Sequence, residues 1–229
     1  MAEIEITQSD ALVPATGFVF IAEANTPAPD FPLHKLTSSD TDIKLDGYNE
    51  SDPDKKKLIW KSVGNTSLDN GIEMAIDGDD PETLGSWQVA ALAATSPKKS
   101  FSLTINLHDI TVETMGLYYG TSAAEAVQRA GQFVIPSSAT AQKRGLLIVG
   151  QDATDMIAWY YPNTDIIGAD SITLDPSALT EVPVKATIVE GVVDKDGEKP
   201  IRAIGKVFQK RPFKPSSAYF TDGSAVLTD

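Results

Sequence analysis

The sequence has 229 residues, 41% of them hydrophobic, which suffices for one large domain with a packed core. It contains no cysteine, which excludes disulfides and thiolate metal sites. A net charge of −13 argues against a protein that grips nucleic acid by neutralising phosphates, although such a surface would repel passing DNA.

The first ten residues carry Glu3, Glu5 and Asp10 and no basic residue. A secretory signal needs a positively charged start and an apolar run, so we expect none. No apolar stretch approaches the roughly 20 residues of a membrane helix, and we expect no membrane insertion.

Short β-rich segments recur along most of the chain. Alternation of apolar and polar residues predicts half-buried strands at residues 72–77, 100–107 and 184–188. Further β-rich runs are residues 17–22, 58–63, 87–93, 131–135, 146–149, 156–161 and 201–208. Many short strands separated by turns predict a mainly β sandwich or barrel.

Two turn signals and two helix signals punctuate these strands. Residues 77–81 (DGDDP) predict a turn between the segments 72–77 and 87–93, and Asp196-Gly197 predicts a hairpin. Residues 111–120 predict a short helix that Thr111 caps and Gly120 ends. Residues 122–130 are a second candidate, and we expect only one of the two to be a firm helix.

Two segments look like extensions of the β domain. Residues 25–57 contain four prolines and many acids, which predicts an extended loop. Because this loop is so polar, we expect Phe31, Leu33 and Leu36 to be buried against another copy of the chain. Residues 212–229 lack a strand or helix pattern and form a predicted C-terminal arm, which leaves residues 1–211 as the β domain.

Charge is unevenly distributed between the two ends. Residues 1–54 carry a net charge of −9 and residues 195–214 a net charge of +5. The split is either chance clustering on a solvated surface or a sign that acidic and basic faces meet between copies. On the second reading the self-assembly contacts at the C-terminal end are Lys206, Lys210, Arg211 and Phe213.

Catalytic and metal-binding signals are weak. His108 beside Asp109 hints at a base, but a pair of surface-loop residues is the commoner reading, and no nucleophile or phosphate-loop motif occurs. The acidic clusters at residues 77–80 and 194–198 resemble calcium ligands, yet Asp and Gly also favour turns. We therefore expect no catalytic residue, no metal and no cofactor.

The three tryptophans, Trp60, Trp87 and Trp159, lie in predicted strands. An exposed aromatic platform would indicate a carbohydrate-binding β module. Tryptophan in a core or an interface is the more common use.

Four short motifs, in order, resemble phage major tail proteins. They are TGFVFIA at residues 16–22 followed by TPAP at 26–29, GNTSLDNG at 64–71, GSWQ at 85–88, and MGLYYG at 115–120. The pattern is most similar to the major tail proteins of phages that infect actinobacteria. Residues 30–57 and the last eighteen residues match poorly.

The resemblance implies a two-sheet β-sandwich or half-barrel flanked by one short helix. It also implies a structural virion protein that stacks as hexameric rings into a tail tube, assembles in the host cytoplasm and carries the genome during ejection. Implied partners are further copies, the tape measure protein, the tail terminator and distal tail proteins, with double-stranded DNA passing through without specific binding. The alternative function is a carbohydrate-binding β module on the virion.

The family places the outward face of one sheet on the channel. The strands at residues 72–77 and 100–107 have the clearest two-faced patterns, and their apolar residues must point to the core. That leaves Glu73, Asp77, Ser102 and Thr104 as candidate channel-lining residues, with the outer surface as the alternative position.

Overall fold

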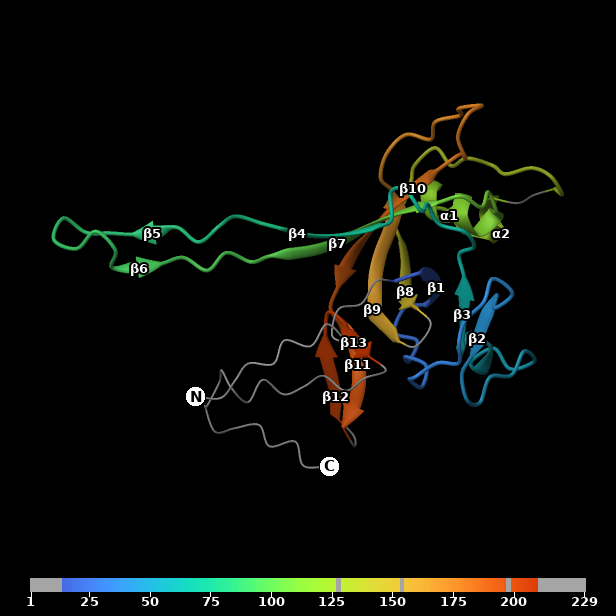
Figure 1. Cartoon of the computed structure of the whole chain (residues 1–229), viewed down its shortest axis with the longest axis horizontal. Helices are drawn as coiled ribbons and strands as arrows, with labels where there is room; N and C mark the ends of the chain where they lie inside the picture. Colours follow the sequence, from blue (N-terminus) through green and yellow to red (C-terminus); the bar gives the residue numbers. More distant parts are fainter. Residues whose placement is uncertain (1–13, 127–128, 153–154, 197–198, 210–229) are drawn as a thin grey trace.

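The computed structural model describes residues 14–126, 129–152, 155–196 and 199–209 (Figure 1). Its strands are β1 (Thr16–Glu23), β2 (Asp42–Lys44), β3 (Ile59–Ser62), β4 (Ile72–Asp77), β5 (Thr83–Leu84), β6 (Ala93–Ala94), β7 (Ser100–Leu107), β8 (Gln142–Gln151), β9 (Met156–Gly168), β10 (Val182–Val189), β11 (Gly191–Asp196), β12 (Lys199–Ala203) and β13 (Lys206–Gln209). The helices are α1 (Val112–Tyr119), α2 (Ala123–Ala126) and the 3-10 turn Lys55–Lys57. The expected mainly β fold with one short helix is confirmed.

Nine strands form one antiparallel sheet in the order β2-β3-β1-β8-β9-β10-β7-β4, with β13 added beside β9. Strand β9 links the two halves because it is 13 residues long. Its first part pairs with β13 from Ile157 to Tyr160, and its last part pairs with β10 from Asn163 to Gly168. The hairpin expected at Asp196-Gly197 is confirmed as β11 and β12.

A bulge in β9 changes the face on which its side chains lie. Arg144 pairs with Thr164 and Leu146 with Tyr161, so Pro162 and Asn163 together stand opposite Gly145. The extra residue reverses the in–out alternation of the strand. Tyr160 accordingly belongs to one buried cluster and Ile166 to another, although both have even positions.

These two clusters lie on opposite faces of the sheet. The first contains Leu117 of α1 with residues of β1, β7, β8, β9 and β10. The second gathers Phe20, Trp60 and Tyr160 with residues of the segment 25–45. Both faces of the β1–β8–β9 region are therefore covered.

Helix α1 forms where its end signals predict it. The Thr111 hydroxyl accepts a hydrogen bond from the Thr114 backbone N–H, and the Thr114 hydroxyl accepts one from the Thr111 backbone N–H, which completes a capping box. Gly120 ends the helix with φ 65°, a left-handed conformation that glycine adopts without strain. The second candidate is only the four-residue turn α2.

The expectation that residues 25–57 bury their apolar side chains only against another copy is wrong for Leu36. Leu36 is 2% exposed, and the Gln151 side chain satisfies both its backbone N–H and its carbonyl, at 3.0 and 2.6 Å. Leu33 packs against the same cluster, and Phe31 stacks on Phe208 with ring centroids 5.6 Å apart. The polar loop of residues 25–57 packs onto the core of the same chain because buried side chains form hydrogen bonds with its backbone.

Two further bonds hold the same loop. The Trp60 indole donates to the Pro27 carbonyl at 2.9 Å, and the Tyr160 hydroxyl donates to the Thr26 carbonyl at 2.8 Å. Buried polar groups need such partners, and these come from residues far away in the sequence. Residues 25–57 are thus a layer of the domain, with β2 pairing to β3.

Three predicted local features are wrong. Residues 77–81 do not turn the chain, residues 87–93 are not a strand, and residues 131–135 are a loop. The chain instead continues outward from β4, turns between β5 and β6, and returns as β7 (Figure 1). The predicted arm at residues 212–229 lies outside the described residues.

We predict that Leu36→Ala lowers the free energy of unfolding by about 2–5 kcal/mol, because it leaves a cavity in the second cluster. Denaturant unfolding of the monomer measures this value. Leu174→Ala is the control, since Leu174 is 80% exposed and should change stability by less than about 0.5 kcal/mol. Equal stability of the two variants would contradict the assignment of Leu36 to the core.

Candidate assembly surfaces

The most prominent surface is a long two-stranded hairpin, defined here as residues 77–100 (Figure 1). Its legs start where Asp77 pairs with Ser100, and Leu84 pairs with Ala93 near its end. The Lys99 ammonium binds the Gly78 carbonyl at 2.9 Å and the Asp80 carboxylate at 3.3 Å. The hairpin is therefore a structured arm that leaves the body of the protein.

The tip of this hairpin is apolar and uncharged. Residues 83–97 contain no Asp, Glu, Lys or Arg. Trp87 is 103% exposed, and the other exposed apolar side chains of the tip are Leu84, Val89 and Leu92. The Ser86 N–H donates to the Val89 carbonyl at 2.7 Å, which holds the turn. Such a tip has apolar surface to bury, and no residue in the described part of the chain packs over Trp87.

Strand β4 is an edge of the main sheet. It pairs with β7 on one side, and no strand in the described parts of the chain pairs with its other side. Met74 and Ile76 on this strand are 43% and 65% exposed. An exposed edge with apolar side chains is a template for pairing with another chain.

One face of the β4–β7–β10 region is polar. Glu73 stands opposite Thr104, and Thr104 stands opposite Lys185. In the next row Ser102 stands opposite Thr187, and Thr187 opposite Asp165. Side chains paired in this way share a face, here the face away from the cluster that contains α1.

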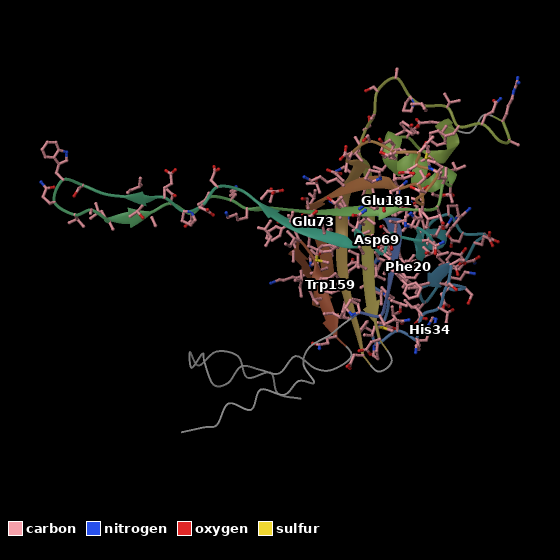
Figure 2. All side chains as sticks on the ribbon, turned by 45° about the horizontal axis from the view of Figure 1, so that its top comes forward. Phe20, His34, Asp69, Glu73, Trp159 and Glu181 are labelled. Atoms are coloured by element: carbon pink, nitrogen blue, oxygen red, sulfur yellow. The ribbon has the colours of Figure 1, made fainter. Side chains whose placement is uncertain are left out.

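All four candidate channel residues lie on this polar face. Glu73 and Asp77 are exposed, and Thr104 is half-buried. Ser102 is only 6% exposed and its hydroxyl donates to the Asp77 carboxylate at 3.5 Å, so the expectation that it faces solvent is wrong. Strands on both sides of β7 cover a short side chain at this position. Figure 2 shows Glu73 near the base of the hairpin.

The basic residues of this face, Lys143 and Lys185, carry no local sequence signal. Lys143 binds Asp165 at 3.0 Å, and Lys185 is exposed in the same row as Glu73. Cross-strand register alone brings them together, and residues 73, 143 and 185 are too far apart in sequence for any local pattern. The face is therefore mixed in charge, with its acids concentrated on β4.

An apolar groove of about 320 Å³ lies on the other face of β4. Its apolar lining includes Met74, Ile76, Trp159, Tyr161 and Val207. Burial raises the pKa of the Tyr161 phenol. We call this the base groove, because its β4 residues lead directly into the hairpin.

Gly205 shapes the base groove. A Cβ atom at this position would lie 2.6 Å from the Tyr160 carbonyl oxygen and 2.8 Å from the Tyr161 ring. Glycine therefore lets the turn before β13 approach β9 closely. Lys206 follows on β13, is half-buried and lines the groove. The sequence had instead suggested an exposed cation in the basic C-terminal stretch. Lys210, Arg211 and Phe213 lie outside the described residues.

The His108–Asp109 neighbours bind other groups. The His108 ring nitrogen Nδ1 lies 3.1 Å from the Thr180 carbonyl, whereas the Asp109 carboxylate accepts from the backbone and side-chain amides of Asn65, each at 3.0 Å. Both residues thus fasten loops to the sheet.

His34 lies 3.1 Å from Asp40 in an exposed turn. The backbone N–H and the hydroxyl of Thr37 and the His34 ring lower the pKa of the Asp40 carboxyl, with the Thr37 N–H as the largest cause. Among the described residues no group of three or more His, Asp or Glu side chains is arranged to hold a metal ion. None of the helices described is long and apolar enough to cross a membrane.

Comparison with known proteins identifies relatives. The family model described as phage tail tube protein matches residues 6–204. The chain is 29% identical over 182 residues to the major tail protein Gp23 of Mycobacterium phage D29, covering 78% of this chain and 84% of the relative. It is 28% identical over 183 residues to the major tail protein Gp23 of Mycobacterium phage L5, with the same coverage.

Proposed function

The chain belongs to the phage tail tube protein family, and we propose that its copies polymerise as stacked hexameric rings into a virion tail tube through which the genome passes during ejection. The observation that carries this proposal is the hairpin of residues 77–100, which leaves the body of the protein and exposes an apolar tip. A monomeric protein gains nothing from such an arm, whereas a polymer uses it to join subunits.

Ring closure is assigned to the sheet edges. The outer side of β4 offers unpaired backbone groups that a strand of the next copy can use. A head-to-tail contact of this kind closes into a ring when a whole number of copies completes a full rotation. The hairpin then connects one ring to the next, which produces an open-ended tube.

The channel is assigned to the polar face that carries Glu73 and Asp77. DNA that slides through a tube must not be held by many phosphate contacts, because each adds affinity that depends on salt. Exposed carboxylates repel the DNA backbone at short range. Lys143 is already neutralised by Asp165 on the same face, which limits its attraction for phosphate.

The charge split between the chain ends supports a role in the register of neighbouring copies. Arg202 is exposed and pairs with Glu190 of its own chain at 3.5 Å. Exposed pairs steer association more than they stabilise it, so the basic stretch 195–214 and the acidic residues 1–54 of a neighbour would set orientation. Half-buried Phe31 and Leu33 lie in the same acidic region.

The remaining proposals follow from family membership. The chain would assemble in the host cytoplasm and act with a tape measure protein, a tail terminator and distal tail proteins, without any catalytic step of its own. The carbohydrate-binding alternative needs an aromatic platform. Trp60 is fully buried, Trp159 is half-buried and Trp87 stands at the hairpin tip, so the three tryptophans do not form one.

We predict that replacing residues 79–98 by Asn-Gly yields a folded chain that forms no tubes. Gly78 and Lys99 follow the pair Asp77–Ser100, so a two-residue turn can join them, and the buried clusters remain intact. Electron microscopy and sedimentation measure assembly, and denaturant unfolding measures the fold. Leu174→Ser with Leu179→Ser is a control that removes exposed apolar side chains elsewhere. Tubes of normal length from the shortened chain would contradict the role of the hairpin.

We predict that Glu73→Lys with Asp77→Lys slows DNA release from assembled particles, most strongly at low salt. Lysines facing the channel would bind phosphates, and each contact steepens the dependence of log affinity on log salt by about 0.9. Asp170→Lys with Asp175→Lys is the matched control, because it makes the same charge change at exposed residues of the loop between β9 and β10, outside the polar face and outside the acidic segment 1–54. Unchanged release from intact tubes would mean that other residues line the channel.

A further inference from the structure

We propose that the hairpin tip of one copy docks into the base groove of another copy. The tip is defined by Leu84, Trp87, Val89 and Leu92, and the groove by Met74, Ile76, Trp159, Tyr161 and Val207. This inference rests on the proposed function, because it requires copies in a repeating array. It adds the receiving site, which the projecting hairpin alone does not identify.

The tip cannot fill the groove of its own chain. Trp87 lies ten residues beyond Asp77, which at about 3.3 Å per residue separates them by roughly 33 Å along the paired legs. Its side chain is 103% exposed, so none of the described residues of its own chain covers it. A tip that enters this groove therefore belongs to a second molecule.

The groove has an ordered floor and an exposed rim. Trp159 and Tyr161 are half-buried and pack against the first buried cluster, which fixes the floor. Ile76 and Val207 on the rim are 65% and 45% exposed, so apolar surface remains open to solvent. At about 320 Å³ the groove has the size of a small ligand pocket and can take one large side chain. Figure 2 shows Trp159 close to the base of the hairpin.

Charge favours this occupant over other parts of a second copy. Each copy carries a net charge of −13, so copies repel at long range. The tip, with no charged residue from 83 to 97, can approach at the lowest electrostatic cost. Lys206 is the charged residue among those that line the groove. The acids Asp79, Asp80 and Glu82 lie on the hairpin leg and stay outside the groove when only the tip enters.

The contact also has the symmetry that a tube needs. The hairpin tip and the base groove lie on different parts of the chain, so every copy can insert its own tip into one neighbour and receive the tip of another. A heterologous contact of this kind continues without limit unless it closes on itself. Because Met74 and Ile76 lie on β4, which leads into the receiving copy's hairpin, docking also covers the base of that hairpin.

The first test compares Trp87→Ala with Gln88→Ala, its neighbour in the turn. If Trp87 is the anchor, its removal should raise the concentration needed for assembly at least 30-fold, about 2 kcal/mol at 1.4 kcal/mol per tenfold. Gln88→Ala should assemble as the unaltered chain does. Assembly of Trp87→Ala at the normal concentration would overturn the proposal.

The second test uses the absence of native cysteine. Gln88→Cys keeps Trp87 at the tip, and Val207→Cys puts a thiol on the groove rim. The two single variants are mixed, assembled and oxidised, so that a mixed disulfide joins different molecules. Docking brings the two sites close enough for the 4.4–6.8 Å Cα separation that a disulfide needs. The matched control pairs Gln88→Cys with Leu68→Cys, which is 91% exposed and outside the groove.

We expect tip–groove dimers in tubes with the Val207 variant and none with the Leu68 variant. Tubes without the Val207 cross-link, or with an equal cross-link at residue 68, would overturn the docking site while leaving the tube itself intact. An unaltered chain that forms neither rings nor tubes would instead overturn the proposed function, and the docking site with it.

Discussion

The architecture depends on the hydrogen-bonding capacity of β9. This strand pairs with β8 along most of its length, with β13 at its start and with β10 at its end. A single strand thereby carries both halves of the sheet. The bulge at Pro162 and Asn163 is what makes this possible, because it turns the buried side chains from one face to the other. Without it, Tyr160 and Ile166 would compete for the same cluster.

The bulge has a cost that the surrounding contacts offset. The Asn163 side-chain oxygen is buried without a hydrogen-bond partner in the described structure, a defect worth about 1–3 kcal/mol. Tyr160 next to the bulge donates to the Thr26 carbonyl, and Thr164 donates to the Arg144 carbonyl at 2.8 Å. These bonds fix the strand on both sides of the irregularity. The body of the domain is therefore complete without help from the hairpin.

The body of the domain and the hairpin therefore differ in how their side chains are contacted. The body is held together by contacts within the chain, and even the proline-rich segment 25–57 is bound through Gln151, Trp60 and Tyr160. The hairpin instead holds its own legs together by β-pairing and by Lys99, and leaves its tip exposed. The buried clusters of the body thus stabilise the fold, whereas the exposed tip takes no part in them. A change at the tip should act on association and leave folding unaltered.

The sequence could predict what local patterns encode. Alternation placed β4 and β7 and put Glu73 and Thr104 on one face, and the Thr111 and Gly120 signals bounded α1. It could not predict the fate of Leu36, because the amide that binds its backbone belongs to Gln151, 115 residues away. Polarity of the loop was the misleading signal, since it says nothing about which backbone groups are satisfied by distant side chains.

The prediction of a strand at residues 87–93 failed for a different physical reason. Residues 87–93 have the composition of a half-buried strand, and a periodicity argument assumes that burial occurs within the same chain. The tip is exposed in the single chain, so the burial that a strand pattern implies is not found there; the proposed docking would supply it between copies. The base groove could not be predicted from the sequence either, since residues 74, 159 and 207 meet only through the pairing of β4, β9 and β13 with their neighbours. In the proposed tube, an uncharged apolar tip and an apolar groove would let copies of a strongly acidic chain adhere to one another while their acidic residues repel DNA.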